Sequence, residues 1–193
     1  MSKAEAGAFR LIRPDLEHLP GFVDALRRGW SPDNIRGAET ARRILAAIDE
    51  DPAAYIATTN DPRAEAGDIT LPDGTKAKRL PGFHRWIWDG EFCGQIGLRW
   101  APEGGGELPA HVLGHVGYAV PAWKRGRGYA TLALARLLPE ARALGLPFLT
   151  LTTDPDNIPS QKVILANGGR LVERFRKLEA YGGAEALRWR IDL

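Results

Sequence analysis

The sequence lacks most of the features that would place it in a specialised class of protein. Its single cysteine, Cys93, can form neither an internal disulfide nor a thiolate zinc site by itself, which indicates a reducing compartment. No run approaches the roughly 18 apolar residues of a membrane span. Residues 1–7 lack the apolar core of a signal peptide. These absences predict a cytoplasmic protein without a membrane partner.

An excess of charge of one sign is also lacking. The formal net charge is +2, whereas a nucleic-acid-binding protein usually carries a clear basic excess on one face. We therefore expect no nucleic-acid partner. The composition, 44% hydrophobic and 26% charged, predicts a folded chain, and 193 residues suffice for one domain with a substantial core. We interpret 1–193 as a single domain, with a loop or hairpin insertion near 59–81, where Asp, Pro and Gly concentrate.

Hydrophobic periodicity and turn residues predict an α+β fold with a mixed, mostly antiparallel sheet. Helices are expected at 16–28, 39–48, 130–144 and 157–167, the last of them ended by Gly168. Strands are expected at 9–13, 54–58, 83–88, 91–100, 115–120, 148–153, 170–177 and 186–191. Asp89-Gly90 forms the turn between two of these strands. Pro139 interrupts the third helix, but the apolar pattern continues beyond it, so we expect one kinked helix there.

The stretch Arg125-Gly-Arg-Gly-Tyr-Ala130 stands between a predicted strand and a predicted helix. Gly126 and Gly128 let the backbone turn sharply and approach a ligand closely, because neither has a Cβ. Tyr129, Ala130 and Thr131 then begin a helix whose first N–H groups have no partner within the helix. Such a helix start binds anions, and the nearby Lys124, Arg125 and Arg127 add positive charge. The stretch predicts a diphosphate site.

Two common phosphate-binding motifs do not fit this stretch. The nucleoside-triphosphate loop ends in Gly-Lys-Ser/Thr, and the sequence contains no such string. The dinucleotide fingerprint would require glycine at Thr131 and an acidic residue about 20 positions further on, and it usually follows the first strand of its domain.

The remaining match is to the pattern Gln/Arg-x-x-Gly-x-Gly/Ala, which resembles the coenzyme A pyrophosphate loop of the GNAT (general N-acetyltransferase) superfamily. The segment "NIPSQKVILANGG" similarly resembles the second motif of that family, Asn-x-x-Ser followed by a short helix and glycine. The resemblance covers roughly 86–174, and 9–34 more loosely. The combined string is also similar to a subgroup of uncharacterised predicted acetyltransferases.

The resemblance implies a central sheet of about seven strands, with splayed parallel fourth and fifth strands at 115–120 and 148–153. Acetyl-CoA would enter between these two strands as co-substrate. Its diphosphate would contact the loop, and its pantetheine arm would lie along the fourth strand. The implied cofactor-binding residues are Tyr118, Ala119, Val120, Arg125, Gly126, Arg127, Gly128, Tyr129, Ala130, Thr131, Asn157 and Ser160. The loop between the first two helices borders the acceptor pocket in this family, so Trp30 and Asp33 are candidate substrate residues.

The catalytic groups are less well defined by the sequence. His115 stands where many GNAT enzymes place an acid on the fourth strand, and a histidine could take the proton from an ammonium group. Strand alternation would place it on one face with Gly117 and Ala119. The alternative is a core histidine bonded to the backbone. The tyrosine that often serves the family as general acid is replaced by Ile164, which leaves Tyr118, Tyr181 or water to protonate the thiolate. No metal site is expected.

We therefore predict an acetyl-CoA-dependent N-acetyltransferase that acts on a primary amine by direct attack. The acceptor could be a small molecule or an amine of a peptide or protein, and the enzyme could be a homodimer. A catalytically weak acyl-CoA-binding or regulatory module of the same fold is the alternative, and Ile164 is the feature that favours it. A nucleic-acid-binding protein that uses "KRGR" is a third hypothesis, which the near-neutral charge opposes.

Overall fold

The computed structural model of the chain describes residues 9–71, 73–102 and 106–193. The start of the chain, Pro72 in the predicted insertion and residues 103–105 lie outside the described residues. Two larger sheets form the centre of the fold. The first contains β1 (Arg10–Ile12), β5 (Gly82–Trp88), β6 (Phe92–Arg99) and β7 (Val116–Ala119), and β2 (Asn60–Asp61) pairs with β5. The second contains β8 (Phe148–Thr153), β10 (Glu185–Asp192) and β9 (Arg170–Arg176), in that order across the sheet.

The α+β class is confirmed, but the division into two sheets differs from the expected single sheet of about seven strands. All pairings among the described strands are antiparallel, and none joins β7 to β8. The expected splayed parallel pair is therefore not observed. A backbone hydrogen bond from His115 N to Thr150 O (2.8 Å) links the start of β7 to β8. Beyond that bond the two strands belong to separate sheets.

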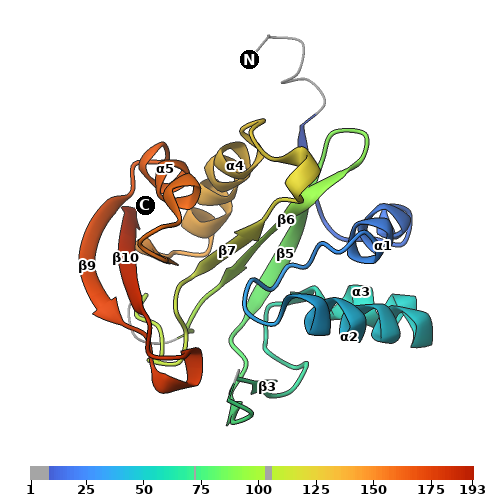
Figure 1. The fold of residues 1–193 in the computed structure, drawn as a ribbon, viewed down its shortest axis with the longest axis horizontal. Coiled ribbons are helices and arrows are strands. Elements are labelled where there is room, and N and C mark those ends of the chain that lie inside the picture. Colours follow the sequence, from blue (N-terminus) through green and yellow to red (C-terminus); the bar gives the residue numbers. More distant parts are fainter. Residues whose placement is uncertain (1–8, 72, 103–105) are drawn as a thin grey trace.

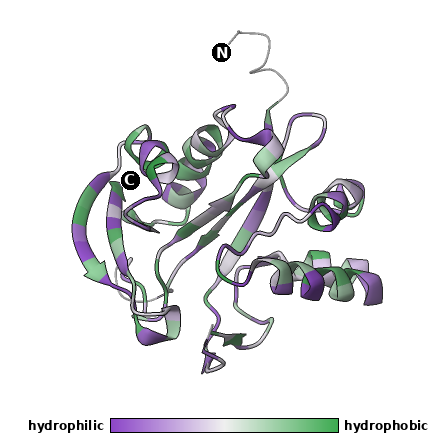
Figure 2. Ribbon diagram, viewed as in Figure 1, coloured by the Kyte–Doolittle hydropathy of each residue, from purple (hydrophilic) through white to green (hydrophobic). Residues whose placement is uncertain are grey.

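Helices cover both sides of the central strands (Figure 1). α1 (Leu19–Arg27), α2 (Gly37–Glu50) and α3 (Pro52–Thr58) lie on one side, whereas α4 (Tyr129–Ala143) and α5 (Ile158–Leu165) lie on the other. Leu134 and Leu137 of α4 share one core cluster with Ile96, and Phe22 of α1 packs with Trp86 in a second cluster. Figure 2 shows both polar and apolar residues along α1, α2 and α4, as expected for helices with one buried face.

The segment 59–81 contains β2 and a small hairpin of β3 (Ile69–Thr70) and β4 (Lys76–Ala77). The strand predicted at 54–58 is wrong, because these residues belong to helix α3. Asp51 begins that helix: its Oδ1 accepts hydrogen bonds from the N–H groups of Ala53 (2.9 Å) and Ala54 (3.0 Å), and Pro52 occupies the first helical position. An Asp-Pro start of this kind favours a helix.

The prediction that Pro139 lies within one helix is confirmed, because α4 runs unbroken from Tyr129 to Ala143. Next to this proline, Glu140 reaches the first sheet. Its Oε2 accepts a hydrogen bond from Nη2 of Arg85 at 2.6 Å. The Arg85 side chain is only 8% exposed and Glu140 is 36% exposed. This ion pair fastens α4 to β5.

We predict that Glu140→Ala destabilises the fold more than Arg85→Met does. The first change leaves a buried guanidinium without its carboxylate, which costs about 1–3 kcal/mol or more, whereas the second leaves a carboxylate that water can reach. Urea unfolding of both variants and of the double variant measures the difference. Equal losses in the two single variants would contradict the asymmetry.

Candidate functional site

A groove of about 1200 Å³ follows the unpaired side of β7 between the two sheets. Its volume exceeds the roughly 300–1,000 Å³ of an ordinary small-molecule pocket, which suits a long ligand. Of the predicted site residues, all line the groove except Arg127 and His115. A smaller hollow of about 580 Å³ lies beside α1, and no motif residue lines it.

The loop before α4 has the backbone form that the sequence predicts for an anion site. Gly126 and Gly128 have φ angles of 75° and 78°, in the left-handed region that glycine tolerates best. The first hydrogen bond within α4 runs from Leu132 N to Gly128 O (3.0 Å). The N–H groups of Tyr129, Ala130 and Thr131 therefore remain available at the positive end of a 15-residue helix.

The three cations of this loop have different environments. Lys124 is buried, and its Nζ pairs with Asp89 (3.2 Å) and Glu91 (2.9 Å), so its charge is used within the protein. Arg125 is exposed, and its Nε donates to the Val120 carbonyl (3.1 Å). Arg127 is exposed outside the groove lining. Lys124 and Arg125 line the groove and Arg127 does not, and of the two lining cations only Lys124 has its charge paired with acidic side chains among the described residues.

Asp89 connects the tight turn after β5 to the start of α4. Its Oδ2 accepts a short hydrogen bond from the Tyr129 hydroxyl, and its carboxylate pairs with Lys124. Burial alone would raise the pKa of Asp89, but the hydrogen bonds from Tyr129, Lys124 and neighbouring groups hold this pKa at about 2. Sequence reasoning assigned Asp89 only to a turn. No local pattern predicts its contact with Tyr129, 40 residues later.

The backbone of β7 faces the groove at alternate residues. Arg99 N donates to His115 O (2.9 Å), and Gly97–Gly117 and Gln95–Ala119 continue the same register. In an antiparallel pair the backbone groups of alternate residues point toward the partner strand. Those of Tyr118 and Val120 therefore point away from β6, as the Arg125–Val120 bond also indicates. An extended ligand beside β7 would meet free backbone groups.

Tyr118 and the start of α5 meet across the groove. The Tyr118 hydroxyl lies 2.6 Å from Ser160 Oγ, and burial raises the pKa of Tyr118. Asn157 caps α5, since its Oδ1 accepts from Ser160 N (3.2 Å). Ile164, at the position of the family's usual tyrosine, is fully buried in this wall. Tyr181, the other candidate acid, donates to His111 O (2.8 Å) away from the groove.

Trp30 and Asp33, from the loop between α1 and α2, line the same groove. The carboxylate of Asp33 is fully engaged, because Oδ1 accepts from the N–H groups of Ile35 (2.8 Å) and Arg36 (3.0 Å) and Oδ2 accepts from the Thr40 hydroxyl (2.9 Å). These bonds outweigh the effect of burial and lower the pKa of Asp33. The buried Trp30 indole packs edge-on against Phe22 and Phe92. Asp33 thus stabilises the loop that forms this wall, because both of its carboxylate oxygens are bonded within the protein.

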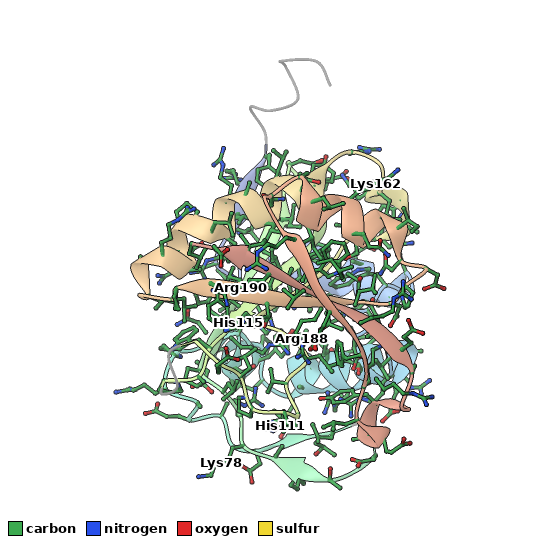
Figure 3. All side chains as sticks on the ribbon, turned by 90° about the vertical axis from the view of Figure 1, so that its left-hand side faces the viewer. Lys78, His111, His115, Lys162, Arg188 and Arg190 are labelled. Atoms are coloured by element: carbon green, nitrogen blue, oxygen red, sulfur yellow. The ribbon has the colours of Figure 1, made fainter. Side chains whose placement is uncertain are left out.

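His115 is buried and is not among the residues that line the groove. Figure 3 labels it in a view from the side of β9 and β10. It is 0% exposed, and its Nδ1 accepts the backbone N–H of Thr150 at 2.9 Å. Burial lowers its pKa to about 4, so the ring is neutral at physiological pH with its Nδ1 lone pair occupied. We predicted that His115 shares an open face of the strand with Gly117 and Ala119. Those two residues line the groove, but the His115 side chain does not, so the prediction is wrong for His115. This geometry argues for the alternative, a core histidine bonded to the backbone.

Comparison with known proteins identifies the fold. The sequence profile of the acetyltransferase (GNAT) domain matches residues 34–170, more than two thirds of the chain. The chain belongs to the GNAT acetyltransferase family. No curated protein matches this GNAT chain.

Three solved structures illustrate the likeness of the fold. The microcin C7 self-immunity acetyltransferase MccE, in complex with acetyl-CoA and AMP, is 14% identical, with a TM-score of 0.60 over 96% of this chain and 93% of the other. RimL, a ribosomal L7/L12 α-N-protein acetyltransferase in complex with coenzyme A, is 13% identical, with a TM-score of 0.60 over 98% and 96%. RimJ of Mycobacterium smegmatis is 18% identical, with a TM-score of 0.59 over 95% and 81%.

Within 9–71, 73–102 and 106–193, no group of three or more His, Cys, Asp or Glu side chains could hold a metal ion. In the same part of the chain, no helix is long and apolar enough to cross a membrane.

The buried histidine predicts a pH-dependent stability. The pKa of His115 is lowered from 6.5 to about 4, so the unfolded state binds the proton more readily. Stability should therefore fall as the pH decreases from about 6.5 to about 4. In His115→Asn, whose Oδ1 can still accept the Thr150 N–H, part of this dependence should disappear. Denaturant unfolding at several pH values tests this, and identical pH slopes in the two proteins would contradict it.

Gly128→Val should abolish the binding of coenzyme A, because a side chain at φ 78° strains the turn that presents the helix N–H groups. Gly145→Val is the matched control. Gly145 has a φ of 76° at the other end of α4, and a Cβ there would meet no atom within 4 Å. Isothermal calorimetry should show undiminished affinity in the control and none in Gly128→Val. Normal affinity in a folded Gly128→Val protein would defeat the assignment of the loop.

Proposed function

We propose that this GNAT chain is an acetyl-CoA-dependent N-acetyltransferase that moves the acetyl group directly to a primary amine. The observation that carries the proposal is the continuity of one groove. It runs from the free helix start at Tyr129, along the outward backbone of β7, to the loop between α1 and α2 at Trp30. A diphosphate site, a surface for an extended arm and an opening for a second substrate thus lie in one cavity.

The residues of the chain suit acetyl-CoA in three places. The N–H groups at the start of α4 and the exposed Arg125 would bind the diphosphate. The backbone N–H groups of Tyr118 and Val120 would bind the pantetheine arm and the thioester oxygen, whose negative charge grows as an amine attacks. In RimL and RimJ, which share the fold, coenzyme A is present in the solved structures.

The reaction requires two proton transfers. The amine must lose a proton before its nitrogen can attack the carbonyl carbon, and the sulfur must gain one when the carbon–sulfur bond breaks. Tyr118 is suited to the second transfer. Tyr118 lines the groove, its hydroxyl contacts Ser160 Oγ, and its raised pKa keeps the hydroxyl protonated at neutral pH. Because His115 is buried with its Nδ1 occupied, we assign the first transfer to water in the groove.

The alternative function, a weakly catalytic acyl-CoA-binding module, is favoured by Ile164 and by the interior position of His115. The two functions differ in turnover rather than in binding. Calorimetry with coenzyme A and acetyl-CoA, beside a thiol-release assay over a panel of primary amines, separates them. An N-acetyltransferase should release coenzyme A in an amine-dependent manner. Tight binding without amine-dependent release would favour the module, and absence of binding would refute both.

Tyr118→Phe should lower kcat by about 10²–10⁴-fold if its hydroxyl protonates the thiolate, with little change in acetyl-CoA affinity. Tyr181→Phe is the control, because it removes the same hydroxyl from a tyrosine outside the groove lining. The high-pH limb of the kcat profile should also change in Tyr118→Phe only. Equal kcat values in wild type and Tyr118→Phe would assign the protonation of sulfur to another group.

A further inference from the structure

We infer that Arg99 binds a carboxylate carried by the acceptor, so that the substrates are primary amines with a carboxylate a few bonds from the nitrogen. This inference rests on the proposed acetyl transfer and deepens it. It starts from the face of the first sheet that looks toward α1 and α2, where an acceptor would reach the groove. Arg99 ends strand β6 on that face.

Strand alternation assigns the residues to the two faces. Ile96 and Leu98 of β6 pack in the core cluster beneath α4, so Gln95, Gly97 and Arg99 point the other way, toward α1 and α2. On the neighbouring strand, Gly117 pairs with Gly97, and Ala119 pairs with Gln95. Gly117 and Ala119 also line the groove. Gly117 and Ala119, which line the groove, therefore lie on the same face of the sheet as Gln95, Gly97 and Arg99 of β6, and we call these five residues the strip.

Gly97, Gly117 and Ala119 of this strip have little or no side chain. A Cβ at Gly97 would lie 2.6 Å from the ring of His84, and a Cβ at Gly117 would lie 3.4 Å from Nη2 of Arg99. The Arg99 guanidinium thus extends over Gly117 instead of pointing away from the groove. His84 fills the space over Gly97, so the open part of this floor lies at Gly117, which is exposed in the groove, and the Arg99 guanidinium borders it.

The charge of Arg99 has no acidic partner in the part of the chain that the structure describes. Its side chain is exposed and makes no ion pair there. Surrounding protein nevertheless lowers its pKa by desolvation, as expected for a cation in a recess. Asp33, the acid that lines the groove nearby, is already bonded to Arg36, Ile35 and Thr40.

The other titratable groups around this recess include the neutral side chains of His84 and Tyr181 and the carboxylate of Asp73. The pKa of His84 is lowered to about 4, by burial first and then by Arg99, Arg79 and Arg85, so its ring is neutral. Burial raises the pKa of Tyr181, which keeps its phenol protonated, and Asp73 contributes to the same shift, which marks it as the remaining carboxylate in the vicinity. A guanidinium in a partly desolvated recess, without an ion-pair partner among the described residues, favours an anion, and its planar fork matches a carboxylate in two parallel hydrogen bonds.

The test uses acceptor pairs that differ only in a carboxylate or its carboxamide: amino acids and their amides, and short peptides with Glu or Gln in the first two positions. In the wild-type enzyme the charged member of a pair should have the lower KM. Arg99→Met should reduce kcat/KM for the charged member by about 10- to 100-fold, the loss expected for a charge-assisted hydrogen bond. The kcat/KM for the neutral member and the KM for acetyl-CoA should change little in Arg99→Met. The kcat/KM of Arg99→Lys for the charged member should lie between those of the wild type and Arg99→Met.

Arg174→Met is the matched control, since it removes an exposed strand arginine from β9 at the edge of the second sheet, whereas Arg99 lies over Gly117 of the groove lining. Acetyl transfer without discrimination between the members of a pair, or an equal loss for both members in Arg99→Met, would overturn the role of Arg99 and leave the proposed function intact. Absence of acetyl-CoA binding would instead refute the proposed function. If no amine turns over, calorimetric titration of the coenzyme A complex with each pair decides, and equal affinities in wild type and Arg99→Met overturn the inference.

Discussion

The groove depends on a single link between the two sheets. His115 donates its backbone N–H to the carbonyl of Thr150, and its imidazole accepts the N–H of the same residue. One residue therefore satisfies both backbone groups of an edge residue of β8, at the place where β7 begins. Beyond this point neither β7 nor β8 pairs with another described strand on the side that faces the groove. The two sheets can therefore separate here while the backbone groups of Thr150 keep their partners. The fully buried ring, packed edge-on against Phe148, fixes where the separation starts.

A second contact network fixes the other end of the groove. The turn at Asp89 is joined to Lys124 and Tyr129, so the first sheet holds both sides of the glycine-containing loop. The cations of the loop therefore have two different roles. Lys124 stabilises the position of the loop, while Arg125 and the helix N–H groups face outward. Because the start of α4 is already held in place, its N–H groups need little rearrangement when an anion binds. Preorganised dipoles bind anions strongly because the free-energy cost of reorganisation is small.

Local signals in the sequence were sufficient for most of the elements and for the loop. Asp89-Gly90 predicted the turn between β5 and β6, and Gly168, with a φ of 79°, lies in the turn after α5, which ends at Leu165, two residues before the expected end. The error at 54–58 was avoidable, since the cap Asp51-Pro52 stands in the sequence. Contacts over long separations were not predictable in this way. The partners of His115 and Lys124 lie 35 residues away along the chain, and their burial depends on how the two sheets meet.

Strand β9 forms an outer edge of the second sheet and is exposed along most of its length. Leu171 and Val172 would make such an edge attractive to another strand, but Arg170, Glu173, Arg174 and Arg176 surround them with charge. Ion pairs with Arg188 and Glu185 of β10 orient part of this charge. Charged edges of this kind oppose the addition of further strands. The colloidal behaviour of the protein is therefore coupled to ionic strength: salt that screens these charges weakens the barrier to association along β9, and dilute buffers preserve it.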